Sequence, residues 1–258
     1  RCPPLKGSSA DNIKDRSAGI VFRYNYVEQG VDLLALRDPQ SNRLFEAAAK
    51  DCLGERLSSS AFVYGNTFVA TEMTVWDEWP IFIAHGDGDY GHGEVRDGHL
   101  YFYNNRVISR LDMAENTGLG VPLFHIQNKQ TPTTVVARNN VFYATKATPQ
   151  GKAAPFALFY WQGNGDFQSN WINQYVKVMA RKEDGGMSSG TRWNGAGIES
   201  LKASGDDPGF VDVARGDFNV REGSPFFKLD APMPEAVIKR GLQPTGKGVM
   251  RPFEAVIR

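Results

Sequence analysis

Four segments of the chain share one pattern, in which apolar residues alternate with polar ones, an Asn follows, and further apolar or β-branched residues come next. The aligned asparagines are Asn25, Asn66, Asn105 and Asn140, and a weaker fifth copy places Asn170 in the same position. Their spacing falls from 41 to 39, 35 and 30 residues, so the repeat length is loose. The copies are IVFRYNYV at 20–27, FVYGNTFV at 62–69, LYFYNNRVI at 100–108, VVARNNVFY at 135–143 and FQSNWI at 167–172.

A second short apolar segment follows each of the first four copies, and Gly, Pro, Asn and Asp bound these segments, as is typical of strands. The segments are DLLAL at 32–36, PIFIA at 80–84, VPLFHI at 121–126 and PFALFYW at 155–161. A repeated unit of strand and loop cannot bury its apolar face alone, so it must stack on its neighbours. The pattern therefore predicts an all-β parallel β-helix, a solenoid in which the asparagines form a ladder from coil to coil.

A coil of such a solenoid needs only some twenty-odd residues, so the surplus residues are expected in long loops on one side, where a binding groove is usually built. The richest loops are 75–79, 85–99 and 113–120. The repeat is absent after residue 205, and the end of the chain is rich in Pro and Gly. We expect coils over 1–205 and an irregular C-terminal cap and tail over 206–258, because a solenoid needs an atypical piece over its last open edge.

The composition, 41% hydrophobic and 22% charged, suits a globular chain. The 29 basic and 29 acidic side chains cancel, so no net charge favours nucleic acid or an anionic membrane as a partner. No apolar run approaches the roughly 20 residues that cross a bilayer, so no membrane span is expected. The two cysteines, Cys2 and Cys52, are compatible with two buried thiols or with one bridge.

DPGFVD at 207–212, followed by GDFNVREGSPFF at 216–227, resembles the closing segment of many secreted bacterial proteins of the pectate-lyase-like superfamily. That superfamily has the right-handed parallel β-helix fold. The resemblance implies this fold and a secreted or periplasmic location. It implies less about activity, since the fold hosts lyases, hydrolases, epimerases and adhesins.

Residues 12–37 are similar to a segment of chondroitinase-B-like and alginate-lyase-like polysaccharide lyases. In those enzymes a Lys begins one coil, an R-Y-N strand follows, and an Arg ends the next strand. The resemblance places the catalytic base at Lys14 and the catalytic arginine at Arg37. Arg16, close to them in the sequence, is expected to contact substrate. The chain differs from those lyases in the Asp-Arg pair after the lysine and in Asp38-Pro39 after the arginine. An alternative is that Lys14, Asp15 and Arg16 form a solvated surface run.

The same segment also resembles a group of uncharacterised bacterial β-helix proteins in which several coils precede it. The chain is accordingly expected to correspond to the C-terminal half of a longer solenoid. The strand near 20–27 would then present an open parallel edge, against which a missing N-terminal segment or a second chain packs.

The loop at 85–99 combines three of the four histidines with several carboxylates. Asp87, Asp89 and Glu94 offer the hard oxygen ligands that suit Ca²⁺, although the rest of an EF-hand pattern is missing. The histidines at 85, 92 and 99 leave zinc as another option, and a solvated polar loop as a third. Substrate contacts are expected from Trp76, Trp79, His85, Tyr90 and His92, because aromatic faces stack on sugar rings. Trp161, Trp171 and Trp193 are expected near loops as well.

The function expected from these features is a polysaccharide lyase that cleaves an acidic, uronate-containing polysaccharide or oligosaccharide by β-elimination. A glycoside hydrolase on the same fold is one alternative, with its carboxylates among Asp87, Asp89 and Glu94. A non-catalytic glycan-binding or adhesion module is another. Apart from Ca²⁺, no cofactor is expected, since the sequence has no Walker loop, GxSxG elbow, CxxC pair or HExxH helix.

Overall fold

The structure is a computed structural model. It describes residues 11–17, 19–28, 30–38, 50–71, 81–86, 96, 98–110, 112–113, 121–126, 133–145, 152–153, 156–179, 192–198 and 201–244. The richest of the expected long loops, at 75–79, most of 85–99 and 114–120, lie outside these ranges.

Most described strands belong to three parallel sheets, in which each strand pairs with its counterpart one repeat further along the chain. Sheet 1 contains β1 (Lys14–Asp15), β4 (Asp32–Leu36), β7 (Ile81–His85), β11 (Val121–Ile126), the first part of β15 (Phe156–Gln168) and β17 (Val176–Met179). Sheet 2 contains β2 (Ile20–Arg23), β5 (Ser60–Tyr64), β8 (His99–Tyr103), β12 (Thr134–Arg138), the second part of β15 and β18 (Arg192–Asn194). Sheet 3 contains β3 (Tyr26–Glu28), β6 (Thr67–Ala70), β9 (Arg106–Ser109), β13 (Val141–Ala144) and β16 (Trp171–Ile172).

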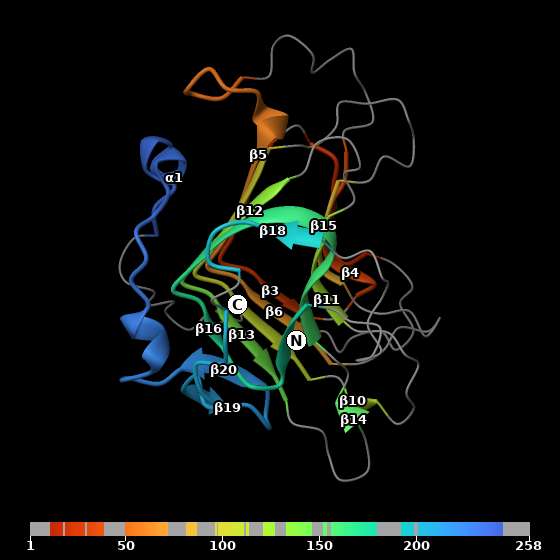
Figure 1. Ribbon diagram of the computed structural model, residues 1–258, viewed down its shortest axis with the longest axis vertical. Helices are drawn as coiled ribbons and strands as arrows, with labels where there is room; N and C mark the ends of the chain where they lie inside the picture. Colours follow the sequence, from red (N-terminus) through yellow and green to blue (C-terminus); the bar gives the residue numbers. More distant parts are fainter. Residues whose placement is uncertain are drawn as a thin grey trace, which may run out of the picture.

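The prediction of an all-β chain with stacked parallel sheets is confirmed, and the arrangement is compatible with a parallel β-helix (Figure 1). The predicted second strands at 32–36 and 121–126 coincide with β4 and β11. One detail differs, because each Asn-containing segment forms two strands in two sheets instead of a single strand. The chain turns between them, so three strands, one from each sheet, make up one repeat.

The turn inside each Asn-containing segment depends on a residue with left-handed backbone, and that residue precedes the aligned Asn. The φ angles are +57° at Tyr24, +54° at Asn104, +55° at Asn139 and +49° at Ser169, and Gly65 has +67°. The left-handed residue is thus the one before the aligned Asn and not the aligned Asn itself. Asn and Gly tolerate the left-handed region best. This explains why the YNN and RNN motifs contain two asparagines, the first in the left-handed turn and the second in the ladder.

The aligned asparagines form the predicted ladder. The Asn66 Oδ1 accepts hydrogen bonds from the backbone N and the Nδ2 of Asn25, at 2.9 and 3.2 Å. The same pair of bonds joins Asn66 to Asn105, Asn105 to Asn140, and Asn140 to Asn170. Asn66, Asn105 and Asn140 are fully buried, so these bonds satisfy polar groups that would otherwise be costly to remove from water.

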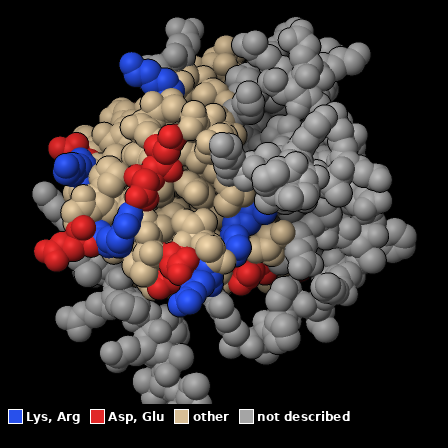
Figure 2. All heavy atoms as spheres, turned by 90° about the horizontal axis from the view of Figure 1, so that it is seen from below, with Lys and Arg blue, Asp and Glu red and all other residues tan. Residues whose placement is uncertain are grey.

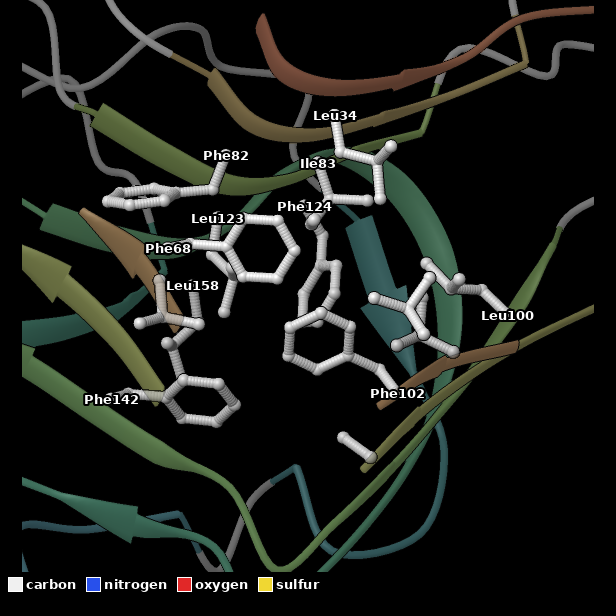
Figure 3. Close-up of a cluster of buried hydrophobic side chains, with 14 of the residues drawn as sticks. Leu34, Phe68, Phe82, Ile83, Leu100, Phe102, Leu123, Phe124, Phe142 and Leu158 are labelled. Atoms are coloured by element: carbon white, nitrogen blue, oxygen red, sulfur yellow. The ribbon is translucent and has the colours of Figure 1, made fainter. Parts of the chain in front are cut away.

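The three sheets face a shared apolar interior. Figure 3 shows Phe124 of sheet 1 beside Phe102 of sheet 2, and Phe68 of sheet 3 belongs to the same cluster. The register places Phe22, Val63, Phe102 and Ala137 in one row, in agreement with the alignment of the repeats on their Asn.

The C-terminal segment, residues 206–244, contains β19 (Phe210–Asp212), β20 (Asp217–Val220), the 3₁₀ helix η3 (Pro225–Lys228) and α1 (Glu235–Lys239). We call this segment the C-terminal strap. It was expected to cover the last open edge, but it lies along the outer faces of sheets 2 and 3 (Figure 1). Phe210, Phe218 and Phe226 pack against the outer residues of sheet 3, and Val237 packs beside Phe62 and Tyr64 of sheet 2.

The Asp-Pro-Gly and Gly-Ser-Pro motifs of the strap hold each other in place. The Asp207 carboxylate accepts the backbone N–H of Gly209 at 2.7 Å and pairs with Arg221 at 2.5 Å. The Ser224 hydroxyl donates to the Pro208 carbonyl and accepts the N–H of Phe226, at the start of η3. Both motifs therefore have a structural role in closing the hairpin of β19 and β20.

The remaining described elements are short. They are the 3₁₀ helix η1 (Leu57–Ser59) and the antiparallel pair of β10 (Asp112–Met113) and β14 (Lys152–Ala153). Cys52 is exposed with a free thiol, so it is not one of two buried thiols, and Cys2 lies outside the described residues. No helix in the described part of the chain is long and apolar enough to cross a membrane. On the face drawn in Figure 2, acidic and basic side chains are interspersed among the described residues.

Candidate functional site

Lys14 and Arg37 are brought to neighbouring strands of sheet 1. β1 and β4 pair in parallel with Lys14 opposite Ala35, and the Arg37 N–H donates to the Asp15 carbonyl at 2.9 Å. The Lys14 side chain is 46% exposed, whereas that of Arg37 is 13% exposed. The two cations that the lyase resemblance singles out therefore occupy adjacent strands near the edge of one sheet.

Each of these two cations pairs with a carboxylate. Arg37 Nη2 lies 2.5 Å from Asp32 Oδ2, although the two residues stand at opposite ends of β4, so the guanidinium side chain runs back along the strand. Lys14 Nζ lies 3.4 Å from Asp11 Oδ2. The charge of Asp11 also acts on the carboxyl group of Asp32. We call Asp11, Lys14, Asp32 and Arg37 the β4 charge cluster.

Within the β4 charge cluster, the surroundings of Asp32 shift the pKa of its carboxyl group. Burial raises the pKa of Asp32 to about 6, and the charge of Asp11 and the hydrogen bond with it act in the same direction. The positive charges of Arg37 and Lys14 oppose this rise. Asp32 therefore holds a proton in mildly acidic solution.

His125 lies in the same sheet, in the row Ala35, Ala84, His125 across β4, β7 and β11. Burial lowers the pKa of His125 to about 4, and the charge of Arg37 lowers it further. The imidazole is thus neutral at neutral pH and lies within the electrostatic reach of Arg37. Sequence reasoning missed His125, Asp11 and Asp32. Asp32 begins β4 and Arg37 directly follows its last residue. This spacing of opposite charges in the sequence could have indicated the ion pair.

A fully buried arginine fixes the backbone next to this cluster. The Arg96 N–H donates to Asp38 Oδ1 at 2.7 Å, and its Nε donates to the Arg37 carbonyl at 3.2 Å. Its Nη2 donates to the Ser17 carbonyl and lies 3.3 Å from Asp15 Oδ2. Arg16, a predicted substrate contact, donates to the Asp38 carbonyl at 3.1 Å. Arg96 therefore ties the ends of β1 and β4 together from the loop at 85–99.

His85, another predicted substrate contact, has no exposed surface. It stands in β7 between Leu36 and Ile126, with its Nδ1 3.4 Å from the Thr133 hydroxyl oxygen. Burial lowers the pKa of His85 to about 3, and the charge of Arg96 contributes. In this conformation the imidazole is a neutral member of the interior.

The other predicted site residues lie outside the described residues. These are Trp76, Trp79, Tyr90 and His92 among the substrate contacts and Asp87, Asp89 and Glu94 among the calcium ligands. Within the described ranges, no three His, Cys, Asp or Glu side chains gather closely enough to hold a metal ion. The calcium site remains a prediction from the sequence.

Two of the tryptophans expected near loops are buried, Trp193 in the interior and Trp171 beneath the C-terminal strap. Trp171 and Trp193 are only 3% and 7% exposed, and Trp193 lies beside Phe124 with ring centroids 6.4 Å apart. Neither presents a face on which a sugar ring could stack, so the expectation of a carbohydrate platform is wrong for these two.

Comparisons of the chain with protein-family models, with curated proteins and with solved structures found no match.

Proposed function

We propose that the chain is a right-handed parallel β-helix protein of the pectate-lyase-like superfamily, secreted or periplasmic, that cleaves an acidic, uronate-containing glycan by β-elimination. The observation that carries the proposal is the position of Lys14 and Arg37 on neighbouring strands, with both charges acting on the same carboxyl group of Asp32. A uronate carboxylate that approached the same two cations would be neutralised in the same way.

The chemistry requires three tasks. The carboxylate next to the reacting carbon must be neutralised, a base must remove the proton from that carbon, and the glycosidic oxygen must leave with a proton. Arg37 and the protonated form of Asp32 suit the first task. Lys14 suits the second once its ammonium has lost a proton and parted from Asp11, and the lysine then returns a proton to the leaving oxygen. The product is an unsaturated uronate and a new chain end.

The glycoside hydrolase alternative gains no support from the carboxyl pair in this cluster. A glycosidase needs two carboxyl groups that act on the glycosidic bond from either side. Asp11 pairs with Lys14 at 3.4 Å and Asp32 pairs with Arg37 at 2.5 Å, so both carboxylates are engaged by cations of the cluster. A hydrolase would have to use the carboxylates at 87, 89 and 94.

The test is to incubate the protein with a panel of acidic glycans, with and without added Ca²⁺, and to follow the ultraviolet absorbance of unsaturated uronates. Lys14→Ala should lower turnover by about two to four orders of magnitude, the usual scale for loss of a general base. The thermal midpoint should barely change, because a half-exposed ion pair contributes little to stability. Lys239→Ala is the matched control, since Lys239 is exposed and pairs with Glu235 at 2.7 Å.

Full activity in Lys14→Ala would move the site away from β1. New reducing ends without absorbance would favour the hydrolase, and retention of a glycan without any cleavage would favour the binding module.

A further inference from the structure

The C-terminal strap has two parts that contact the repeats in different ways. The first part, residues 206–231, buries three phenylalanines against the outer residues of sheet 3. Its end is also fixed by hydrogen bonds, because the Asn139 side chain exchanges two of them with the backbone of Ala231. We call the second part, residues 232–244, the latch.

The latch lies on the outer side of sheet 2 and makes few contacts there (Figure 1). Val237 in α1 is its one buried side chain, and it packs beside Phe62 and Tyr64. The Tyr103 hydroxyl donates to the Leu242 carbonyl at 2.8 Å. In the described part of the chain, no other group outside the latch forms a hydrogen bond with the latch backbone.

The remaining polar contact is a pair of ion pairs made by one side chain. Arg240 Nε lies 2.7 Å from Asp51 Oδ2, and Arg240 Nη2 lies 2.6 Å from Glu55 Oε2. The opposite side of the latch faces solvent, where Ile238 is 48% exposed. The latch is therefore held by one apolar side chain, one hydroxyl and one guanidinium.

The backbone hydrogen bonds of the latch close within the latch itself. The N–H groups of Val237 and Ile238 donate to the Pro234 carbonyl at 2.9 and 3.1 Å, and the Leu242 N–H donates to the Val237 carbonyl at 3.1 Å. α1 has only five residues, and so short a helix is not stable by itself in water. The latch therefore keeps these bonds only while it is docked, and undocking breaks them together.

Two prolines separate the latch from the first part of the strap. Pro232 and Pro234 follow directly on Ala231 and flank Met233. Proline has no N–H group, so neither residue donates a backbone hydrogen bond that would resist a change of direction. Undocking can therefore stop at Ala231, which Asn139 holds in place.

We propose that the latch opens and closes as one unit while the first part of the strap and the three sheets stay folded. Opening separates Arg240 from Asp51 and Glu55, withdraws Val237 from sheet 2 and breaks the bond to the Tyr103 hydroxyl. Segments with few buried apolar contacts open in this way at a lower free energy than the core of the same protein.

The surface under the latch is aromatic. The Phe62 and Tyr101 rings stack with their centroids 5.0 Å apart, and the Tyr64 and Tyr103 rings stack with theirs 4.7 Å apart. While the latch is closed, none of these four residues is more than 7% exposed. Opening therefore turns a buried face of sheet 2 into an exposed apolar surface.

Hydrogen exchange of the full chain in its native state, followed by NMR, tests the proposal. The amides of residues 237, 238, 241 and 242 should exchange through one common opening, about tenfold or more faster than those of β8 and β12 beneath them, relative to intrinsic rates. Arg240→Ala should speed the latch amides by a further factor of about ten or more, the effect of losing hydrogen bonds to a charged group. The amides of β19 and β20 should change by no more than about twofold.

Arg221→Ala is the matched control, because Arg221 pairs with Asp207 within the first part of the strap. It should leave the exchange of the latch unchanged. A fluorescent dye that binds exposed apolar surface should bind more strongly to Arg240→Ala than to Arg221→Ala, since only the first variant uncovers the rings of sheet 2.

Three results would overturn the proposal. Latch amides that exchange as slowly as those of β8 and β12 would show that the latch opens only when the whole chain unfolds. An equal increase in the latch and in β19 and β20 would show that the strap opens as a whole. Latch amides with unrelated rates, or with the same rates in Arg240→Ala and Arg221→Ala, would show fraying that Arg240 does not control.

Discussion

At the scale of single residues, Asp32 gives the site a measurable pH dependence. Its pKa of about 6 in the folded chain exceeds the value near 4 of an unfolded carboxyl group, so the folded state binds more protons between these values. Stability from this group is therefore greatest at low pH and falls as the pH rises from about 4 to about 6. The sign is opposite to that of a carboxylate stabilised by a salt bridge alone.

Asp32→Asn removes this titration. The free energy of unfolding of the native chain, minus that of the variant, should decrease by up to about 3 kcal/mol between pH 4 and pH 6.5. Denaturant titrations at four pH values in this range measure the difference. Asp212→Asn, which removes a carboxylate 3.6 Å from Arg215, is the control and should give a much smaller change. A pH-independent difference for Asp32→Asn would show that burial does not control this carboxyl group.

At the scale of elements, the asparagines of the ladder contribute unequally to stability, depending on their position in it. Asn105 is fully buried and bonds to Asn66, Asn140 and the Val63 carbonyl, whereas Asn25 bonds in one direction only. Asn105→Ala should cost about 3 kcal/mol or more, because several buried groups lose partners at once. Asn25→Ala should cost about 1 kcal/mol or less. Equal losses in chemical denaturation would mean that the ladder is not cooperative.

An arginine of the C-terminal strap forms ion pairs with the early part of the chain. Arg240 pairs with Asp51 and Glu55, and its guanidinium lies 5.5 Å from the centre of the Phe62 ring. Its side chain is 5% exposed, so Arg240→Ala should cost about 2 kcal/mol through lost packing and pairing. The exposed Arg221, which pairs with Asp207, is the control, and Arg221→Ala should cost about 0.5 kcal/mol or less. If thermal melting shows no difference between the two variants, the strap is not anchored by Arg240.

At the scale of the whole molecule, the sequence predicts the strands well and the site poorly. The Asn repeat and the bounded apolar segments identify β4, β5, β8, β11 and β12, because stacked repeats impose the same pattern on every copy. The bend before each Asn was not predicted, since it depends on the backbone of a residue whose identity varies from Tyr to Gly to Ser. Lys14 and Arg37 were found by resemblance, whereas Asp11 and Asp32 matter only because the fold places them beside these two cations.

The course of the strap also escaped prediction, because it depends on contacts between distant parts of the chain. Tyr103 donates to the Leu242 carbonyl at 2.8 Å, and Asn139 exchanges two hydrogen bonds with Ala231. Neither pair leaves a local pattern in the sequence.

The bond between Arg240 and Asp51 joins residues 189 positions apart, and this has a consequence for how the protein is made. During synthesis the early repeats can stack while the ribosome is still extending the chain. The stacked rings of Phe62 with Tyr101 and of Tyr64 with Tyr103 then face water, because the strap that covers them is translated after them. Contacts of such long range form slowly. Until the strap docks, the nascent protein therefore exposes an aromatic surface that can aggregate or bind chaperones.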